Sequence, residues 1–281
     1  MTFTDRLEAR ARRLGRRIAF PEGRDPRVAE AADRLLSRGV VEPVLLEAEG
    51  DGALARSVAM LREGAVDGVV AGAVHTSAEV IRAGLGEVGL RPGVRTLSSS
   101  FFMEVRDFRS RGTEVLSFAD AGVVPEPGSR RLAEIAAESV RTRRMVVGDE
   151  PCVAFLSYST LGSGNGRSIE RVREAVRRFR AACPEVPADG ELQADAALIP
   201  GVAETKAAGS VAAGRANVLV FPSLDAGNIA YKLVERLARA TALGPVLQGL
   251  SAPLNDLSRG ASAADIAHVA AITALMAGRG G

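Results

Sequence analysis

Segments typical of strands and of helices alternate along almost the whole chain of 281 residues. The first clear case is an apolar strand at residues 17–21, then a helix, then a second strand at residues 42–46. Asp25 and Pro26 suit the N-cap and first position of that helix, and Gly39 suits its end. A strand, a helix and a strand in this order form a βαβ unit, whose strands pair in parallel. The alternation therefore predicts an α/β fold with largely parallel sheets.

The same alternation continues to the C-terminus. Two extended runs at residues 96–105 and 114–120 flank a polar, arginine-rich link and are expected to form a hairpin. A glycine- and proline-containing turn at residues 89–93 is expected to end a first domain. Further strands are expected at residues 68–71, 152–158, 191–199, 217–221 and 245–250, and helices at residues 5–14, 57–63, from 77, 129–147, 168–182, 226–242 and 262 to about 277.

Composition favours a globular enzyme and argues against several other classes. Apolar residues make up 47% of the chain and charged residues 25%, and the net charge of +2 gives no support for binding to nucleic acid or to a membrane surface. No apolar run approaches the roughly 18 residues of a membrane span. The two cysteines and two histidines lack metal-ligand spacing, so no metal site is predicted. We expect a cytoplasmic protein that binds neither nucleic acid nor membranes.

One stretch near the C-terminus carries side chains suited to chemistry on an anionic substrate. Arg259 offers a planar set of donors for phosphate, and the hydroxyl of Ser258 can donate one more hydrogen bond. Asp265, a turn into the next predicted helix, could accept a proton. However, Ser262 and Asp265 also have the spacing of a helix capping box. From spacing alone, the catalytic and the structural interpretation of Asp265 both stay open.

Two more segments have features of ligand sites, each with a structural alternative. The glycine-rich run at residues 161–168 follows a predicted strand and opens a helix, where backbone N–H groups can face a phosphate, but a flexible loop has the same composition. Asn228, Tyr231 and Lys232 share one face of a predicted helix, which suits either binding or packing. Lys232 is one of only two lysines in an arginine-rich chain, so its site either needs a compact ammonium or reflects sampling.

Five motifs, in order along the chain, carry a resemblance to a known enzyme family. They are residues 18–23 (IAFPEG), 72–76 (GAVHT), 189–197 (DGELQADAA), 225–232 (DAGNIAYK) and 255–266 (NDLSRGASAADI). With these motifs the chain resembles phosphate acetyltransferases and phosphate butyryltransferases nearly from end to end. The resemblance implies a two-domain α/β/α fold with largely parallel sheets and an active site in the cleft between the domains. The first domain would comprise residues 1–94 and 251–281, and the second residues 95–250.

The resemblance also implies an activity and a set of functional residues. The family reaction transfers an acetyl group reversibly between acetyl phosphate and coenzyme A, so we expect acetyl-CoA, phosphate and acetyl phosphate as substrates, no cofactor, and a homodimer. A thiol is mostly protonated at neutral pH, and Asp265 would be the base that activates it. Arg259 would hold the phosphoryl group and Ser258 would donate to substrate or leaving group. The substrate-binding residues implied are Arg82, Ser159, Thr160, Asn228, Tyr231 and Lys232.

The chain departs from the family pattern after Leu46. Enzymes of the family carry several tens of additional residues there, including a substrate-binding arginine, where this chain has only the bridge at residues 47–52. Three outcomes stay open: weaker anion binding, replacement by Arg56 or Arg62, or loss of activity. Two alternative functions stay open: a butyryltransferase-type enzyme, because the sequence does not give the pocket volume that sets acyl-chain length, and a non-catalytic domain that binds acetyl-CoA, which the missing segment favours. A hydroxyacid dehydrogenase is disfavoured because the chain lacks a dinucleotide fingerprint and clustered metal-binding aspartates.

Overall fold

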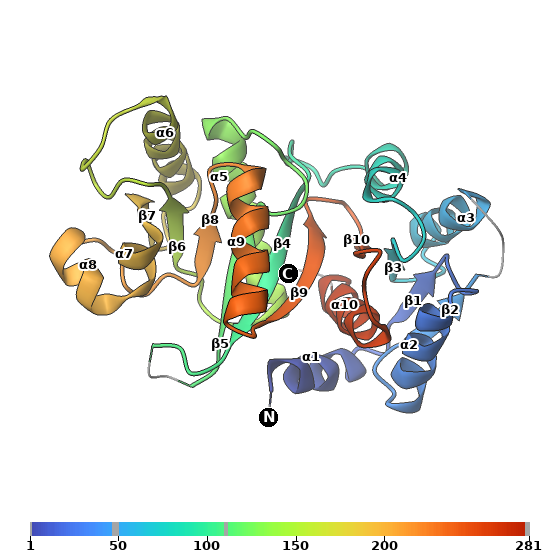
Figure 1. Cartoon of the computed structure of the whole chain (residues 1–281). Coiled ribbons are helices and arrows are strands. Elements are labelled where there is room, and N and C mark those ends of the chain that lie inside the picture. Colours follow the sequence, from blue (N-terminus) through green and yellow to red (C-terminus); the bar gives the residue numbers. More distant parts are fainter. Residues whose placement is uncertain (1, 47–50, 110–111, 279–281) are drawn as a thin grey trace. The chain divides into compact units, whose positions relative to one another are not determined.

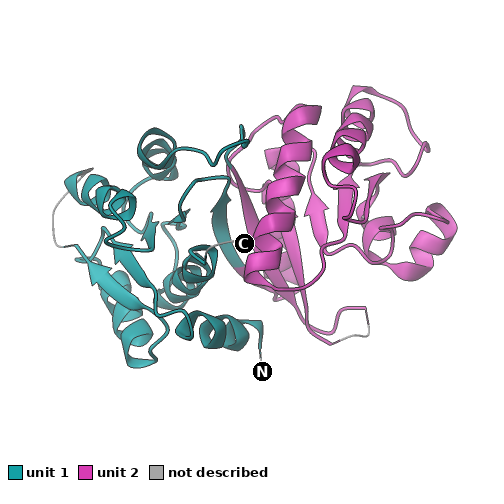
Figure 2. Ribbon diagram, turned by 180° about the vertical axis from the view of Figure 1, so that it is seen from behind, with its two compact units in different colours: residues 1–97, 243–281 teal, residues 98–242 magenta. Residues whose placement is uncertain are grey.

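The computed structural model describes residues 2–46, 51–109 and 112–278 of the chain (Figure 1). Residues 1–97 and 243–281 form one compact unit, called unit 1 here, and residues 98–242 form unit 2 (Figure 2). The sequence placed the corresponding boundaries at residues 94 and 250. None of the described helices is long and apolar enough to cross a membrane.

Unit 1 is built on a four-stranded parallel sheet with the strand order β10-β3-β1-β2. Its first two strands and the helix between them form the predicted βαβ unit, and the side chain of Asp25 caps that helix by accepting a hydrogen bond from the N–H of Arg27. The strands are β1 (Arg17–Phe20), β2 (Glu42–Leu45), β3 (Gly68–Ala71) and β10 (Leu254–Asp256). The helices are α1 (Phe3–Arg12), α2 (Pro26–Ser37), α3 (Asp51–Arg62), α4 (Ser77–Ala83), a π-helical turn (Gly84–Val88) and α10 (Ala263–Met276).

Helix α10 is the centre of the unit 1 core. Residues 266–275 are buried except for His268, and the helix packs on α1, α2 and β3. The sequence did not predict β10, because its three residues include Asn255 and Asp256, which are uncommon in strands. Both are buried nonetheless. The Asn255 side chain accepts a hydrogen bond from the N–H of Leu247 (2.8 Å) and donates one to the hydroxyl of Thr273 on α10 (2.8 Å), so a polar residue fits inside this strand.

Unit 2 contains a mixed sheet in which the order β7-β6-β8-β5-β4 follows from one antiparallel and three parallel pairings. The antiparallel pair is the predicted hairpin. The strands are β4 (Ser98–Val105), β5 (Glu114–Ala119), β6 (Val153–Leu156), β7 (Ala188–Leu192) and β8 (Val218–Val220), and β9 (Thr241–Gln248) spans the boundary between the two units. The helices are α5 (Ser129–Val146), α6 (Arg167–Ala182), α7 (Ala194–Leu198), α8 (Pro200–Lys206) and α9 (Leu224–Leu237).

The prediction of one long strand over residues 191–199 is wrong. Strand β7 ends at Leu192, and the chain continues into the short helices α7 and α8. Residues 191–196 alternate between polar and apolar side chains, which is the pattern of a half-buried strand, but the alternation stops at Ala196 and Ala197, and both are completely buried on α7. The high helix propensity of alanine decides the outcome here.

The strand order of unit 2 contains a reversal between β6 and β8. The chain passes from β6 through α6 to β7 on one side, and β8 then pairs on the other side of β6. In parallel α/β sheets, connections that diverge in this way leave a crevice at the carboxyl ends of the two strands, where ligands commonly bind. The fold therefore marks the ends of β6 and β8 as a position for a site in unit 2.

Candidate active site

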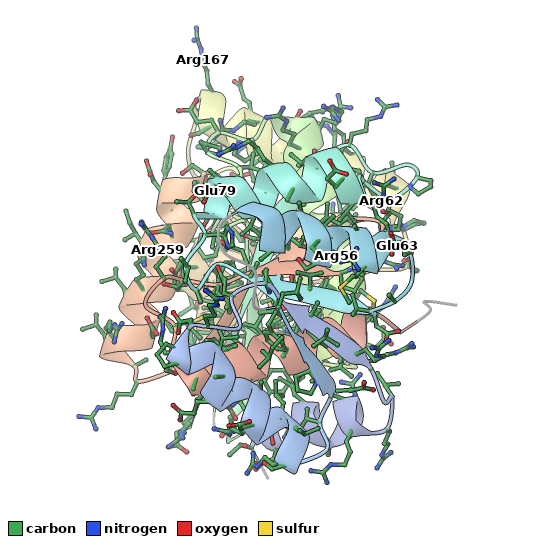
Figure 3. The ribbon with its side chains drawn as sticks, turned by 90° about the vertical axis from the view of Figure 1, so that its right-hand side faces the viewer. Arg56, Arg62, Glu63, Glu79, Arg167 and Arg259 are labelled. Carbon is green, nitrogen blue, oxygen red and sulfur yellow. The ribbon has the colours of Figure 1, made fainter. Side chains whose placement is uncertain are left out.

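The Ser258–Arg259 pair lies in an exposed turn of unit 1 that follows β10. The turn closes through the N–H of Ala261, which donates to the carbonyl oxygen of Ser258 (2.8 Å), while the N–H of Gly260 donates to the Ser258 hydroxyl (3.3 Å). Leu257 before the turn is buried, whereas Ser258, Arg259 and Gly260 are exposed. Figure 3 labels Arg259 on the left-hand side of the view. A donor fork and a hydroxyl thus stand next to each other at the surface, open to an anion.

Asp265 forms the capping box that the spacing predicted. Its Oδ2 atom accepts from the N–H of Ser262 (2.9 Å) and from the Ser262 hydroxyl (2.7 Å), and its own N–H donates back to that hydroxyl (3.2 Å). These bonds fix the carboxylate in the first turn of α10, where the helix dipole favours a negative charge. They use Oδ2 and not Oδ1. The structural role is therefore confirmed, and the catalytic role stays a prediction.

A buried carboxylate that sequence reasoning did not single out organises the neighbouring loop. Glu22 is only 7% exposed and accepts hydrogen bonds from four consecutive N–H groups, those of residues 72–75, at 2.8 to 3.1 Å. The Nδ1 atom of His75 lies 2.8 Å from the same carboxylate. These contacts fix the segment between β3 and α4, the helix that carries Arg82. The only sequence signal for Glu22 was its place in the motif at residues 18–23.

The ends of β3 and β10 approach so closely that only glycine fits at residue 72. Gly72 has a φ of +109°, and a Cβ there would lie 2.5 Å from Oδ1 of Asp256. Asp256 is 3% exposed, and its Oδ1 has no hydrogen-bond partner among the described residues. Burial raises the pKa of Asp256 to about 6; hydrogen bonds from Ser77 and Leu257 oppose the rise, and the charge of Glu22 adds to it. The buried Asp256, two residues before Ser258, therefore has a carboxyl group with a pKa of about 6.

We predict that Asp256→Asn makes the stability of the protein less dependent on pH. The folded-state pKa of about 6 lies above the ordinary value of 3.8 for an aspartate, so ionisation of Asp256 costs stability as the pH rises from about 4 to 6, and the cost persists above pH 6. Asparagine removes a cost of about 3 kcal/mol. The melting temperature of the variant relative to wild type should rise by several degrees between pH 4.5 and 7.5. The exposed control Asp33→Asn should show no such trend, and a parallel pH profile for Asp256→Asn would contradict the prediction.

In unit 2, the predicted residues Ser159 and Thr160 are buried and bonded within their own loop. The hydroxyl of Ser159 donates to Oε1 of Glu191 (2.9 Å), and that of Thr160 donates to Oε1 of Gln193 (3.3 Å). Both residues follow β6, as the sequence predicted, but these hydroxyls support the loop rather than point to solvent. Their role as substrate contacts stays a prediction.

Glu191 is the anchor of this loop, and sequence reasoning missed it. It is 1% exposed and accepts from Nε and Nη2 of Arg173 (2.7 and 2.9 Å) and from the N–H of Gly162 (2.9 Å), as well as from Ser159. Burial acts to raise the pKa of Glu191, but the hydrogen bonds from Arg173, Gly162 and Ser159 outweigh it and hold the pKa at about 2. The glycine-rich segment is therefore held in shape by one ionised carboxylate.

We predict that Glu191→Gln destabilises the protein by about 2 kcal/mol or more, because the Arg173 guanidinium loses its charged partner and the loop loses acceptors. Denaturant unfolding at pH 7 measures the effect. Because the pKa of Glu191 in the folded protein is depressed, the stability that its carboxylate contributes is fully present above pH 4.5 and declines as the pH falls towards about 2. The free energies of unfolding of wild type and Glu191→Gln should therefore converge in acid. Glu174→Gln, which removes a half-buried carboxylate paired with surface arginines on the same helix as Arg173, should change stability by less than about 0.5 kcal/mol. Equal effects of the two substitutions would refute the anchoring role.

A cavity of about 330 Å³ lies in unit 2 at the reversal of strand order. It is lined mainly by apolar side chains that follow β6, β7 and β8, and the first residues of α6, α7 and α9 surround it. Helix N-termini give such a cavity a positive potential, and its volume lies in the range of small-molecule sites. The lining residues are Leu156, Ser157, Tyr158, Ser168, Ala194, Phe221, Pro222 and Ala226.

The three predicted residues on α9 have different surroundings. Asn228 donates to the carbonyl oxygen of Ala121 (3.2 Å), and the ring of Tyr231 stacks on that of Phe101 with centroids 3.9 Å apart. Lys232 is exposed, with Nζ 5.0 Å from the centre of the Tyr231 ring. Packing thus accounts for Asn228 and Tyr231, and Lys232 has the side chain most accessible to a ligand.

The arginines considered for anion binding in unit 1 also differ in their surroundings. Arg82 is exposed in the last turn of α4, and Arg62 on α3 pairs with Glu87 at 3.1 Å. In Figure 3, Arg56 and Arg62, both on α3, are labelled to the right of the centre, and Arg259 is labelled on the left. Residues 47–50 of the bridge at residues 47–52, where the family pattern is interrupted, lie outside the described residues. Replacement of the missing arginine by Arg56 or Arg62 stays a prediction.

The predicted site residues are divided between the two units. Unit 1 holds Ser258, Arg259, Asp265 and Arg82, and unit 2 holds the other five. Their assembly into a single site stays a prediction. Among residues 2–46, 51–109 and 112–278, no group of three or more histidine, cysteine, aspartate or glutamate side chains could hold a metal ion.

Comparisons with known proteins establish the family. A family model described as "Phosphate acetyl/butaryl transferase" matches residues 2–58 and 47–274. A phosphate acetyltransferase of Thermoanaerobacterium thermosaccharolyticum is 39% identical over 99% of this chain and 100% of its own, and one of Paracoccus denitrificans is 41% identical over 96% and 98%. A phosphotransacetylase structure from Streptococcus pyogenes has a TM-score of 0.89 at 34% identity, covering 97% of this chain and 98% of its own. The chain belongs to this family of acyltransferases.

The comparisons also bear out the interruption after Leu46. The alignment with the Thermoanaerobacterium enzyme is 327 positions long although it includes 99% of a chain of 281 residues, so about 50 residues of that enzyme have no counterpart here. The family model likewise matches in two segments that meet between residues 47 and 58. The chain is thus a shortened member of its family.

Proposed function

We propose that the protein catalyses the reversible transfer of an acetyl group between acetyl phosphate and coenzyme A. The observation that carries the proposal is the exposed Ser258–Arg259 turn, followed by Asp265 in the capping box of α10. It occurs in a chain that matches phosphate acetyltransferases over nearly their whole length. The substrates would be acetyl-CoA, phosphate and acetyl phosphate. A non-catalytic domain is disfavoured because all three reactive side chains are present.

The reaction needs a thiolate and a group that stabilises charge on the carbonyl oxygen or the leaving phosphate. Free thiols have a pKa near 8.5, so a positioned base raises the rate by ~10² to 10⁴-fold. Asp265 is our candidate for the base, and Oδ1, which the capping bonds do not use, would accept the thiol proton. Arg259 would bind the phosphoryl group with two parallel hydrogen bonds, and Ser258 would donate to the leaving oxygen. Arg82, Ser159, Thr160, Asn228, Tyr231 and Lys232 remain proposed substrate contacts.

We further propose that the enzyme needs no cofactor, acts in the cytoplasm and forms a homodimer. The acyl transfer as written uses only side-chain acids, bases and donors. The dimer is supported by an apolar row on α9, where Ile229, Leu233 and Leu237 are 57%, 52% and 80% exposed at a spacing of four residues. Sedimentation of the purified chain would measure its mass in solution.

The direct test is release of free coenzyme A thiol from acetyl-CoA in the presence of phosphate or arsenate. We expect turnover with acetyl-CoA that exceeds turnover with butyryl-CoA and that persists in the presence of a metal chelator. Preference for butyryl-CoA would favour the butyryltransferase alternative. Binding of acetyl-CoA without thiol release would favour a regulatory domain.

We predict that Arg259→Ala lowers turnover about 10²-fold or more, the scale for removal of a preorganised donor that stabilises developing charge. Arg259→Lys should recover little activity, because an ammonium group cannot reproduce two parallel hydrogen bonds. Steady-state rates at saturating acetyl-CoA measure both variants. Arg95→Ala, which removes another exposed arginine of unit 1, serves as the control and should stay close to wild type. A fully active Arg259→Lys enzyme would exclude the proposed role.

We predict that Asp265→Asn lowers turnover at least ~10²-fold and removes the acidic limb of the pH–rate profile, while the melting temperature falls by a few degrees at most. Asparagine keeps an oxygen that can accept at the helix start but cannot act as a base. Asp5→Asn is a matched control, because Asp5 forms the same capping box with Thr2 at the start of α1. It should reproduce the thermal effect and leave turnover unchanged. If both variants turn over normally, capping is the whole role of Asp265.

A further inference from the structure

Arg27, near the start of α2, contacts three separate segments of unit 1. Its Nε and Nη2 atoms donate to the two carboxylate oxygens of Asp25 (3.0 and 2.8 Å), and Nη2 also donates to the carbonyl oxygen of Ala73 (2.9 Å). Its Nη1 atom donates to the carbonyl oxygens of Arg259 (2.7 Å) and Ala261 (3.1 Å). All five N–H donors of the guanidinium therefore have acceptors.

The last two of these bonds fix the turn that carries the candidate reactive residues. Among the described residues, the turn is also closed by the bonds from Ala261 and Gly260 to Ser258. The carbonyl oxygens of Arg259 and Ala261, on either side of Gly260, both accept from Arg27 on α2. Arg27 thus binds the backbone of the turn, and the side chains of Ser258 and Arg259 remain exposed.

The third segment is the loop between β3 and α4. Its N–H groups are bound by Glu22, and its Ala73 carbonyl oxygen is bound by Arg27. Asp25 keeps the guanidinium in place as an ion pair, and its hydrogen bond is the main cause that raises the pKa of Arg27. The two loops that follow β3 and β10 are thereby fixed relative to each other by one side chain.

We propose that Arg27 is a positioning residue for the Ser258–Arg259 turn. It does not bind substrate, because its donors are already used by protein acceptors. Instead, it sets the direction of the Arg259 backbone and so the point at which the Arg259 side chain meets an anion. The kinetic part of this inference rests on the proposed function; the structural part does not.

The first experiment measures the turn without an activity assay. Trypsin cleaves after arginine, and the Arg259–Gly260 bond is exposed, so its rate of cleavage reports how firmly the turn is held. Arg27→Lys keeps a positive charge beside Asp25 but cannot supply five donors in a plane. We expect cleavage at Arg259, followed by mass spectrometry at a temperature where both proteins are folded, to be at least ~5-fold faster in Arg27→Lys than in wild type.

Arg34→Ala is the matched control. Arg34 lies on the same helix and pairs with Glu8 (3.4 Å), and within the described part of the chain no hydrogen bond joins it to the turn. This variant should match wild type in cleavage at Arg259 and in turnover. Equal cleavage rates in wild type and Arg27→Lys would overturn the proposal.

The second experiment is a double-mutant cycle on turnover. Arg27→Lys should lower kcat at least ~10-fold, since a displacement of about 1 Å at a reacting group can cost more than that. If Arg27 acts through Arg259, its substitution should have little further effect in an Arg259→Ala background. Multiplicative effects of the two substitutions, or wild-type kcat in Arg27→Lys, would overturn the proposal. If wild type itself transfers no acetyl group, the proposed function fails while the cleavage experiment still decides the role of Arg27.

Discussion

The structure of unit 1 depends on placing a negative charge inside the protein. A carboxylate removed from water costs several kcal/mol unless hydrogen bonds replace its hydration. Glu22 meets this condition with the N–H groups of four consecutive residues, 72–75, and with His75 Nδ1. Those N–H groups can converge on one point only if the loop has a single conformation. The cost of burying Glu22 is therefore what specifies the shape of the loop.

Unit 2 uses the same device at the end of β5. Asp120 is 2% exposed and accepts from the N–H groups of Gly122, Val123 and Val124 (2.8 to 3.2 Å) and from the hydroxyl of Ser99 (2.5 Å). Burial raises the pKa of Asp120, and these hydrogen bonds oppose the rise. In both units a buried acid thus fixes the segment that leaves a strand at the edge where parallel α/β folds bind ligands. The strands place these segments at that edge of the sheet, and the hydrogen bonds to the buried acids make the segments rigid.

Sequence reasoning succeeded where a structure depends on neighbouring residues. The caps at Asp25 and Ser262, the opening βαβ unit and the β4–β5 hairpin are local patterns, and the structure confirms them. It failed where distant residues decide, as at β10, whose polar residues are accommodated by partners on other segments. The same holds for the contacts of Glu22, Arg27 and Glu191, which join segments 18 to 234 positions apart in sequence. A single sequence contains no signal that pairs such residues.

The described contacts also explain why the candidate reactive side chains can be exposed without being loosely placed. Enzymes gain most from charged donors that need no rearrangement when charge develops, so the proposed role of Arg259 requires that its side chain is directed before the substrate arrives. A surface arginine has high rotamer freedom, and an ion pair made by the side chain itself would compete with the substrate. Binding the backbone of the turn through Arg27 avoids that competition, because it restricts where the side chain begins and leaves all of its own donors for an anion.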